Sequence, residues 1–325
     1  MDIKSIIKKP IAEEFEAFKK FYLQQFSSSQ PLLDSALKHV AGTSGKMMRP
    51  MLILLSAKSC GSVNNSAFAA AAALELLHTA SLLHDDVIDE SNMRRGVTSL
   101  NAVYSNRIAI LTGDYLLSTS LYNVAQTKNN EIIEGLAQLG RTLSSGEMSQ
   151  LELQRCGGFS EENYLSVVRN KTASLFASCG NFGALSAGAD ISIVKNFERF
   201  GEILGICFQI KDDIFDYYSH DVGKPTGSDI REGKVTLPAL YALKHSTDDN
   251  IRSIGEKLNN GIALTEDEIT ALIEAAKSIG GIEYSLKRIE EFRIEALELL
   301  HSLTIPDDCR QALTAYLEYV VSRDK

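Results

Sequence analysis

Two copies of an Asp-Asp-x-x-Asp box, each at the end of a long apolar run, are the strongest constraint on this chain. The first box covers residues 85–89 and the second covers residues 212–216. The apolar runs have helical spacing, and residues four apart on a helix share one face, so the outer aspartates of each box lie together. Neighbouring carboxylates repel one another, and apolar surroundings strengthen that repulsion. The sequence therefore predicts two helices whose acidic ends require cations.

Magnesium meets this requirement. It prefers oxygen ligands, takes one or two carboxylates from a protein, and keeps other positions for water and substrate phosphate. Two facing boxes would hold a diphosphate between them through metal ions. A single box is equally well read as an acidic helix end in water, but two matching boxes on apolar helices favour the metal site. The predicted metal ligands are Asp85, Asp86, Asp89, Asp212, Asp213 and Asp216.

The rest of the sequence predicts an all-α protein. It has 325 residues, six prolines, long Ala-, Leu- and Ile-rich stretches and no Pro/Ser-rich linker, so we expect a single domain over residues 1–325. Helical periodicity recurs along the chain, and no alternating Val/Ile/Thr run between turn residues predicts a strand. The five cysteines are scattered without a Cys-x-x-Cys pair, which is typical of reduced thiols in a cytoplasmic protein.

Charge and hydropathy limit the partners. A net charge of -9 disfavours nucleic acid as a ligand. The N-terminus lacks the basic start and apolar core of a signal peptide. The longest apolar run, residues 67–83, is interrupted by Glu75 and His78, so we expect a buried helix there and no transmembrane segment.

Basic residues near the boxes are candidates for phosphate binding. Adjacent arginines just past the first box form either surface ion pairs of little energetic value or a bidentate grip on phosphate. A loop with two lysines after the second box is either solvated or a phosphate clamp. Their position beside predicted metal sites favours phosphate in both cases. The candidates beside the boxes are Arg94, Arg95, Lys224 and Lys234. Lys46 and Arg49, three residues apart in an earlier loop, either converge on one anion or are surface charges, as most such pairs are.

These motifs resemble the trans-isoprenyl diphosphate synthases, also called the polyprenyl synthetase family, from about residue 45 to residue 238. LLHDDVIDESNMRRG resembles the first aspartate-rich motif of the family, and FQIKDDIFDYYSHDVGKPTGSDIREGKVTLP resembles the second with both downstream lysines. GEMSQL and NKTASLF are similar to further family blocks. One departure is Ser44-Gly45-Lys46-Met47-Met48-Arg49-Pro50, where the family usually has Gly-Gly-Lys-Arg-x-Arg-Pro.

The resemblance implies the isoprenoid synthase fold, an antiparallel helical bundle or barrel around a deep central cavity, usually in a homodimer. It implies head-to-tail condensation of isopentenyl diphosphate with an allylic diphosphate primer after magnesium-assisted ionisation, with three magnesium ions per active site. We expect the departing diphosphate to take the proton that is lost, so that no protein base is needed. We also expect transient membrane contact when the product is released.

The resemblance further implies roles for individual residues. The six box aspartates bind the magnesium ions that hold the allylic diphosphate. The same diphosphate is gripped by four cations, namely Arg94, Lys171, Lys224 and Lys234. Isopentenyl diphosphate is held by Lys46, Arg49, His78 and Arg95. Thr172 and Gln209 flank the reacting carbons.

The helix before the first box is expected to set product length. Ala80 and Ser81, about one turn before Asp85, are both small, and the resemblance implies that synthases of short products carry bulky residues there. Side chains on a helix lean towards its N-terminus, so a growing tail runs the same way, past Leu77. From Asp85 back to Leu74 the helix spans ~16 Å at 1.5 Å per residue. We therefore expect a long-chain product of about octaprenyl length.

Other interpretations remain open at this point. Ala80 and Ser81 are alternatively tight helix packing, with the floor of the cavity elsewhere, for example at Tyr122, and the product is then of farnesyl or geranylgeranyl length. A terpene cyclase normally has an Asn/Asp-x-x-x-Ser/Thr-x-x-x-Glu site, which is absent here. A non-catalytic subunit of a heteromeric synthase tends to lose box aspartates or phosphate cations, and this chain keeps them. A helical scaffold would have no reason to gather these charges.

Overall fold

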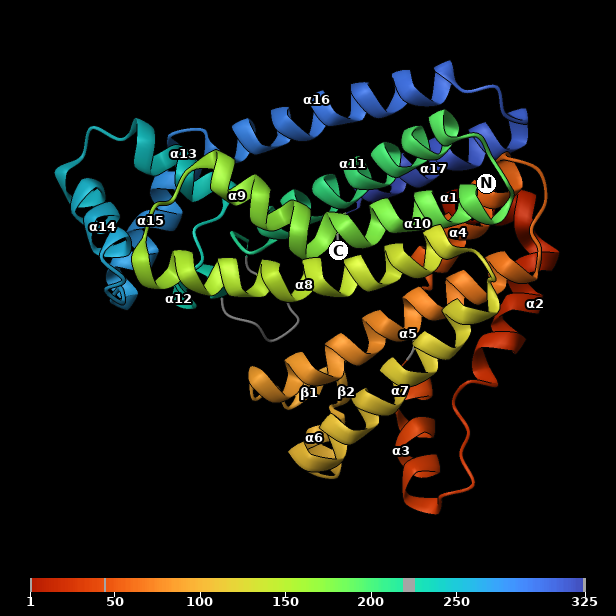
Figure 1. The fold of residues 1–325 in the computed structure, drawn as a ribbon. Coiled ribbons are helices and arrows are strands. Elements are labelled where there is room, and N and C mark those ends of the chain that lie inside the picture. Colours follow the sequence, from red (N-terminus) through yellow and green to blue (C-terminus); the bar gives the residue numbers. More distant parts are fainter. Residues whose placement is uncertain (1, 44, 219–225, 324–325) are drawn as a thin grey trace. The chain divides into compact units, whose positions relative to one another are not determined.

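A computed structural model describes residues 2–43, 45–218 and 226–323. Within these residues the chain is almost entirely helical, as predicted (Figure 1). The contacts divide it into two compact units. The first unit comprises Met1–Gly140, Ser178–Arg199 and Leu303–Ala315, and the second comprises Arg141–Ala177, Phe200–Ser302 and Tyr316–Lys325. The single domain over residues 1–325 stays a prediction.

The elements follow one another along the chain with short connections. The first unit contains α1 (Ile3–Lys8), η1 (Lys9–Ile11), α2 (Ala12–Leu23), α3 (Pro31–Gly42), α4 (Met48–Ser59), α5 (Asn65–Ile88), β1 (Met93–Arg94), β2 (Val97–Thr98), α6 (Leu100–Val103) and α7 (Asn106–Gln126). The second contains α9 (Glu161–Val168), η2 (Arg169–Ala173), α12 (Ser228–Arg231), α13 (Leu237–His245), α14 (Asp249–Asn259), α15 (Glu266–Ser278) and α16 (Gly281–Ser302). Residues of both units occur in α8 (Asn130–Cys156), α10 (Ser174–Ser186), α11 (Ile191–Phe215) and α17 (Asp307–Ser322).

Helix α5 forms much of the core of the first unit. Its N-terminus is capped by Asn64, whose side chain accepts a hydrogen bond from the backbone N–H of Ala67 at 2.9 Å. Ser120 of α7 donates a hydrogen bond to the carbonyl oxygen of Ala73 at 2.6 Å, so α5 and α7 lie close together. Among the described helices, α5 alone has the length and mean hydropathy of a membrane span, and 72% of that stretch is buried in the protein. The predicted buried helix is therefore present.

A short hairpin, β1–β2, follows the first box and was not predicted. Met93 pairs with Thr98 and Arg94 pairs with Val97 in an antiparallel register. The two turn residues, Arg95 and Gly96, have φ of 54° and 77°, as a two-residue type I′ turn requires. Strands of two residues are too short to produce an alternating pattern, so the sequence carries no strand signal here.

Helix α11 reaches the second unit's site by close packing of backbone on backbone. A Cβ added at Gly201 would lie 2.1 Å from the carbonyl oxygen of Phe176, and one added at Gly205 would lie 2.4 Å from the Cα of Ala173. Both distances are shorter than van der Waals contact, so only glycine fits these two positions of α11. The contact brings the last two turns of α11, which carry the second box, next to η2.

We predict that Gly205→Ala lowers the free energy of unfolding by about 1–3 kcal/mol, because the added methyl group must push α11 away from η2. Urea unfolding followed by circular dichroism measures the change. Gly42→Ala is the matched control, since a Cβ at Gly42 would meet no atom within 4 Å. Equal stability of the two variants would contradict the packing described for α11.

Candidate active site

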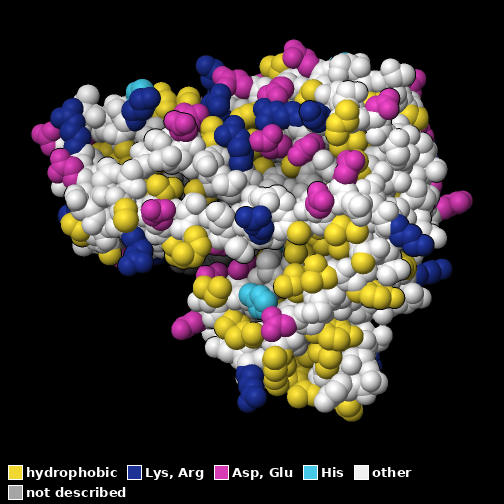
Figure 2. Space-filling model, viewed as in Figure 1, with side chains coloured by type: hydrophobic (Ala, Val, Ile, Leu, Met, Phe, Trp, Pro, Cys, Tyr) yellow, Lys and Arg dark blue, Asp and Glu magenta, His cyan; other side chains and the backbone are white. Residues whose placement is uncertain are grey.

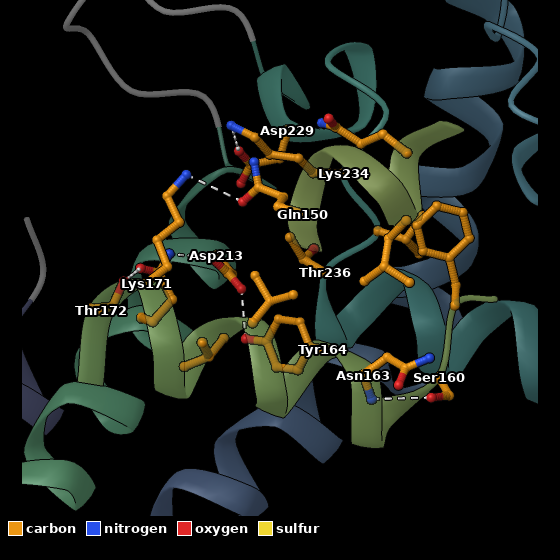
Figure 3. A pocket seen from close by; sticks show the side chains of 17 residues that line it. Gln150, Ser160, Asn163, Tyr164, Lys171, Thr172, Asp213, Asp229, Lys234 and Thr236 are labelled. Atoms are coloured by element: carbon orange, nitrogen blue, oxygen red, sulfur yellow. Dashed lines mark hydrogen bonds and ion pairs between the residues drawn. The ribbon is translucent and has the colours of Figure 1, made fainter. Parts of the chain in front are cut away.

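The predicted site residues divide between two pockets, one in each unit. The first-unit pocket is lined by residues of α2, α3, α5, the β1–β2 hairpin and the adjoining loops. The second-unit pocket is lined by residues of α8, α9, η2, α11 and residues 229–236 (Figure 3). Each pocket contains one buried box aspartate together with basic side chains.

The first box divides its three aspartates between solvent and the first-unit pocket. Asp86 is only 2% exposed and accepts a hydrogen bond from Nε of Arg94 at 2.9 Å. Asp85 is half-buried and Asp89 is exposed. The backbone N–H of Asp89 donates to the carbonyl oxygen of Asp85 at 2.8 Å, so these two residues stay one helical turn apart, as expected. Arg94 therefore neutralises the middle aspartate, and the outer two remain closer to solvent.

Arg95 is held by the loop before α4. Its Nη1 donates a hydrogen bond to the carbonyl oxygen of Thr43 at 3.1 Å. A Cβ added at Gly45 would lie 2.4 Å from the same nitrogen, so the guanidinium rests directly on the glycine backbone. Gly45 is the glycine that this chain keeps from the family loop, and its missing side chain provides the space for Arg95. Ser44, the departure next to it, lies outside the described residues.

The first-unit pocket contains a neutral histidine beside arginine side chains. His78 lines it, and burial together with the positive charges of Arg49, Arg95 and Arg94 holds the pKa of His78 well below its usual range. The imidazole is therefore uncharged at neutral pH. Lys46 is exposed, and neither Lys46 nor Arg49 is among the residues that line the pocket. The structure thus brings His78, Arg94 and Arg95 together, with Arg49 near enough to act through its charge.

In the second-unit pocket, Lys171 and Thr172 come from η2, a π-helical turn of the kind that often marks functional sites. The Nζ of Lys171 lies 2.8 Å from Oε1 of Glu147 and donates to Oε1 of Gln150 at 3.2 Å. Both partners lie in the GEMSQL stretch of α8. This ammonium group is therefore held at the rim of the pocket by one acid and one amide, and Figure 3 shows the bond to the amide of Gln150.

A chain of hydrogen bonds connects η2 to the second box. Oγ1 of Thr172 donates to Oε1 of Gln209 at 2.7 Å, and Nε2 of Gln209 donates to Oδ1 of Asp213 at 2.8 Å. The hydroxyl of Tyr164 donates to Oδ2 of Asp213 at 2.6 Å, as Figure 3 shows. Burial and the negative charge of Asp229 raise the pKa of Asp213 to about 7. The network fixes Thr172 and Gln209, the two residues expected beside the reacting carbons.

The other two aspartates of the second box have different partners. Asp212 accepts a hydrogen bond from Nη2 of Arg323 at 2.5 Å, and the Arg323 guanidinium lies 3.8 Å from the ring centroid of Phe208. Asp216 accepts hydrogen bonds from the backbone N–H groups of Ser228 and Asp229 at 3.0 and 3.1 Å. Helix α11 ends at Phe215, and these bonds hold Asp216 in the turn that follows.

The lysines after the second box are only partly described. Lys234 lines the second-unit pocket, with its Nζ 2.5 Å from Oε2 of Glu232 and 3.8 Å from Oδ1 of Asp229. Lys224 lies outside the described residues. Lys171 and Lys234 thus both line this pocket, while the role expected for Lys224 stays a prediction.

The box aspartates can supply some, but not all, of the ligands of a magnesium ion. Across residues 2–43, 45–218 and 226–323, no three His, Cys, Asp or Glu side chains gather closely enough to hold a metal ion by themselves. Magnesium usually takes one or two carboxylates and completes its shell with water and substrate phosphates. Two half-buried or exposed carboxylates one turn apart, such as Asp85 and Asp89, match that need. A complete cage of protein ligands is therefore not required.

Sequence reasoning missed Tyr164 and Arg323. Tyr164 lies seven residues before Lys171, which is two helical turns, so its place near the pocket was open to a spacing argument. Arg323 lies 111 residues after Asp212, and nothing local marks it. Its contact is formed only by the folded second unit.

Comparison with known proteins places the chain among close relatives. A family model described as polyprenyl synthetase matches residues 30–276. The crystal structure of geranylgeranyl pyrophosphate synthase from Bacteroides thetaiotaomicron is 45% identical, covers 99% of this chain and 100% of that chain, and superposes with a TM-score of 0.85. Octaprenyl diphosphate synthase of Escherichia coli is 32% identical over 319 residues, 97% of each chain. Heptaprenyl diphosphate synthase component 2 of Geobacillus stearothermophilus is 38% identical over 296 residues, 90% of each chain.

We predict that Tyr164→Phe lowers the free energy of unfolding by about 1–3 kcal/mol, because it leaves a buried oxygen of Asp213 without its donor. Urea unfolding measures the loss. Tyr122→Phe is the matched control, since Tyr122 is 66% exposed. If both variants unfold at the same urea concentration as the unchanged protein, the bond from Tyr164 to Asp213 contributes nothing.

Proposed function

Since the chain belongs to the polyprenyl synthetase family and is a trans-prenyltransferase that makes polyprenyl diphosphates, we propose that it condenses isopentenyl diphosphate head-to-tail with an allylic diphosphate. One observation carries the proposal. In each unit, a buried aspartate of a box shares a pocket with basic side chains, which is the arrangement that diphosphate recognition through cations requires.

The second-unit pocket is the proposed place of the allylic diphosphate. Magnesium ions held by the box aspartates, three by family resemblance, would neutralise the leaving diphosphate as its carbon–oxygen bond breaks. Lys171 and Lys234 add fixed positive charge at the pocket. Thr172 and Gln209, held through Asp213, lie beside the carbons that react. The departing diphosphate takes the proton, so the residues here bind and orient without acting as a base.

The first-unit pocket is the proposed place of isopentenyl diphosphate. Its neutral His78 can donate one hydrogen bond, and Arg95 presents a guanidinium fixed by Thr43 and Gly45. Guanidinium groups suit phosphate oxygens because they donate in a planar fork. Arg49 adds positive charge near this pocket. Lys46, which is exposed at the surface, would attract the diphosphate as it enters.

We further propose a long-chain product of about octaprenyl length. The small Ala80 is 2% exposed. It lies one turn before His84, whose ring packs on Gly113 of α7, so Ala80 is directed at α7 as well. Ser81 uses its hydroxyl to donate to the carbonyl oxygen of His78 at 2.9 Å. Ala80 and Ser81 are both small, so neither side chain blocks a tail that runs along this part of α5, and the relative from Escherichia coli is named an octaprenyl diphosphate synthase.

A geranylgeranyl-length product is the second candidate. The observation in its favour is the 45% identity to the structure titled geranylgeranyl pyrophosphate synthase. Tyr122, the alternative floor of the cavity, is 66% exposed on α7 and is not among the residues that line the first-unit pocket.

We also propose a homodimer in the cytoplasm. Exposed apolar side chains gather over α7, where Figure 2 shows them in yellow. They include Ile110, Leu111, Leu121 and Tyr122. Burial of this surface in a dimer would remove it from water. Although one relative is named as a component of a heptaprenyl synthase, this chain keeps every box aspartate, and we expect it to be active alone.

We predict that the purified chain, given farnesyl diphosphate as the primer, incorporates radiolabelled isopentenyl diphosphate when magnesium is present. Incorporation should stop when EDTA is added. Thin-layer chromatography of the dephosphorylated products should show chains longer than geranylgeranyl. Full turnover in EDTA would contradict the proposed role of the aspartates. Geranylgeranyl as the longest product would establish the second candidate instead.

We predict that Ala80→Phe shortens the product by several isoprene units, because a benzyl group would project from α5 into the path proposed for the tail. The same chromatography measures the change, with Ala17→Phe at an exposed position of α2 as the control. An unchanged product length in a folded Ala80→Phe variant would remove Ala80 from the cavity wall.

A further inference from the structure

Two buried polar atoms on α5 lack a hydrogen-bond partner among the described residues. They are Oε2 of Glu75 and Nδ1 of His78. Each residue is only 8% exposed, and both line the first-unit pocket. Buried polar atoms are rarely left unpaired, because the loss of water is then uncompensated. Two such atoms, three residues apart on one helix and in one pocket, indicate a polar ligand that pairs with both.

The charges around Glu75 specify what kind of ligand this is. Arg94 and Arg95 line the same pocket, and Arg49 is close enough to influence both Glu75 and His78. Because Arg94 is paired with Asp86, the positive charges of Arg95 and Arg49 are the ones that favour an anion here. An anion rich in acceptor oxygens also needs donors, and a neutral imidazole and a protonated carboxyl group each supply one.

Glu75 is suited to the uncharged state. Burial raises the pKa of Glu75, and the positive charges of Arg49 and Arg95 oppose that shift without reversing it. An ionised carboxylate facing a diphosphate would repel it, whereas a carboxylic acid donates a hydrogen bond to it.

We propose that Glu75 binds the diphosphate of isopentenyl diphosphate as an uncharged acid, donating from its otherwise unpaired oxygen beside His78. The inference rests on the proposed function, because it takes isopentenyl diphosphate as the occupant of the first-unit pocket. The recognised chemistry is the diphosphate group itself, which inorganic pyrophosphate shares.

The test compares Glu75→Gln, which keeps a donor of similar size, with Glu75→Ala, which removes it, in the full chain. Calorimetry measures the Kd of isopentenyl diphosphate without a primer, and steady-state assays measure both KM values. We expect Glu75→Gln to bind within about 3-fold of the unchanged protein and Glu75→Ala to bind about 10- to 100-fold more weakly. The KM of the allylic primer should not change. Glu13→Ala, at an exposed position of α2, is the control and should bind normally.

Two results would overturn the proposal. If Glu75→Gln loses as much affinity as Glu75→Ala, Glu75 acts as an ionised partner of the arginines. If neither variant loses affinity, Glu75 does not touch the ligand. Glu75→Met, of similar volume and without a donor, replaces Glu75→Ala if the alanine variant does not fold by circular dichroism, and the same weakening is expected of it.

Two further arms separate this inference from the proposed function. Absence of magnesium-dependent incorporation by the unchanged protein contradicts the proposed function, whereas normal incorporation with unaltered binding by Glu75→Ala contradicts only the role of Glu75. Inorganic pyrophosphate, titrated in the same way, should show the same loss in Glu75→Ala. A loss confined to isopentenyl diphosphate would place the contact at the hydrocarbon and overturn the proposal.

Discussion

The burial of carboxylates at the ends of two apolar helices is the constraint on which the rest of the site depends. A buried carboxylate requires opposite charge or hydrogen bonds. Asp86 obtains both from Arg94 of the hairpin, and Asp213 accepts hydrogen bonds from Tyr164 of α9 and Gln209. Each acid thus draws a side chain from another element towards the box. The contacts that make burial tolerable are also the contacts that shape the two pockets.

Glycines, which have no side chain, are as important to the site as the charged residues. At Gly45 the backbone leaves room for the guanidinium of Arg95, and at Gly205 it lets α11 approach Ala173 of η2. Both glycines act at the places where a functional group must come close to another segment. A methyl group added at position 45 would displace the guanidinium of Arg95. A methyl group added at position 205 would displace helix α11.

The helices were open to prediction because their signal is local, whereas the partners of the acids were not. Apolar spacing alone predicted α5 and most of α11, and the two boxes marked the acidic end of each helix. The end of α11 at Phe215 depends on bonds from Asp216 to residues 228 and 229, which no window around the helix contains. Arg323 belongs to the same class, because folding alone brings it to Asp212. The hairpin was not predicted because strands of two residues are too short to show an alternating pattern of apolar and polar side chains.

At the turn of the hairpin, stability and the proposed binding role favour different residues. Arg95 has a left-handed backbone with φ of 54°, which is unfavourable by about 1–2 kcal/mol for a residue with a Cβ. Glycine would relieve that strain, yet it would also take away the guanidinium that rests on Gly45. Selection for heat resistance alone would therefore favour glycine at position 95, whereas the role proposed for Arg95 in diphosphate binding would keep the strained arginine. Thermostable variants of this enzyme that lose affinity for one substrate are expected to carry changes at this turn.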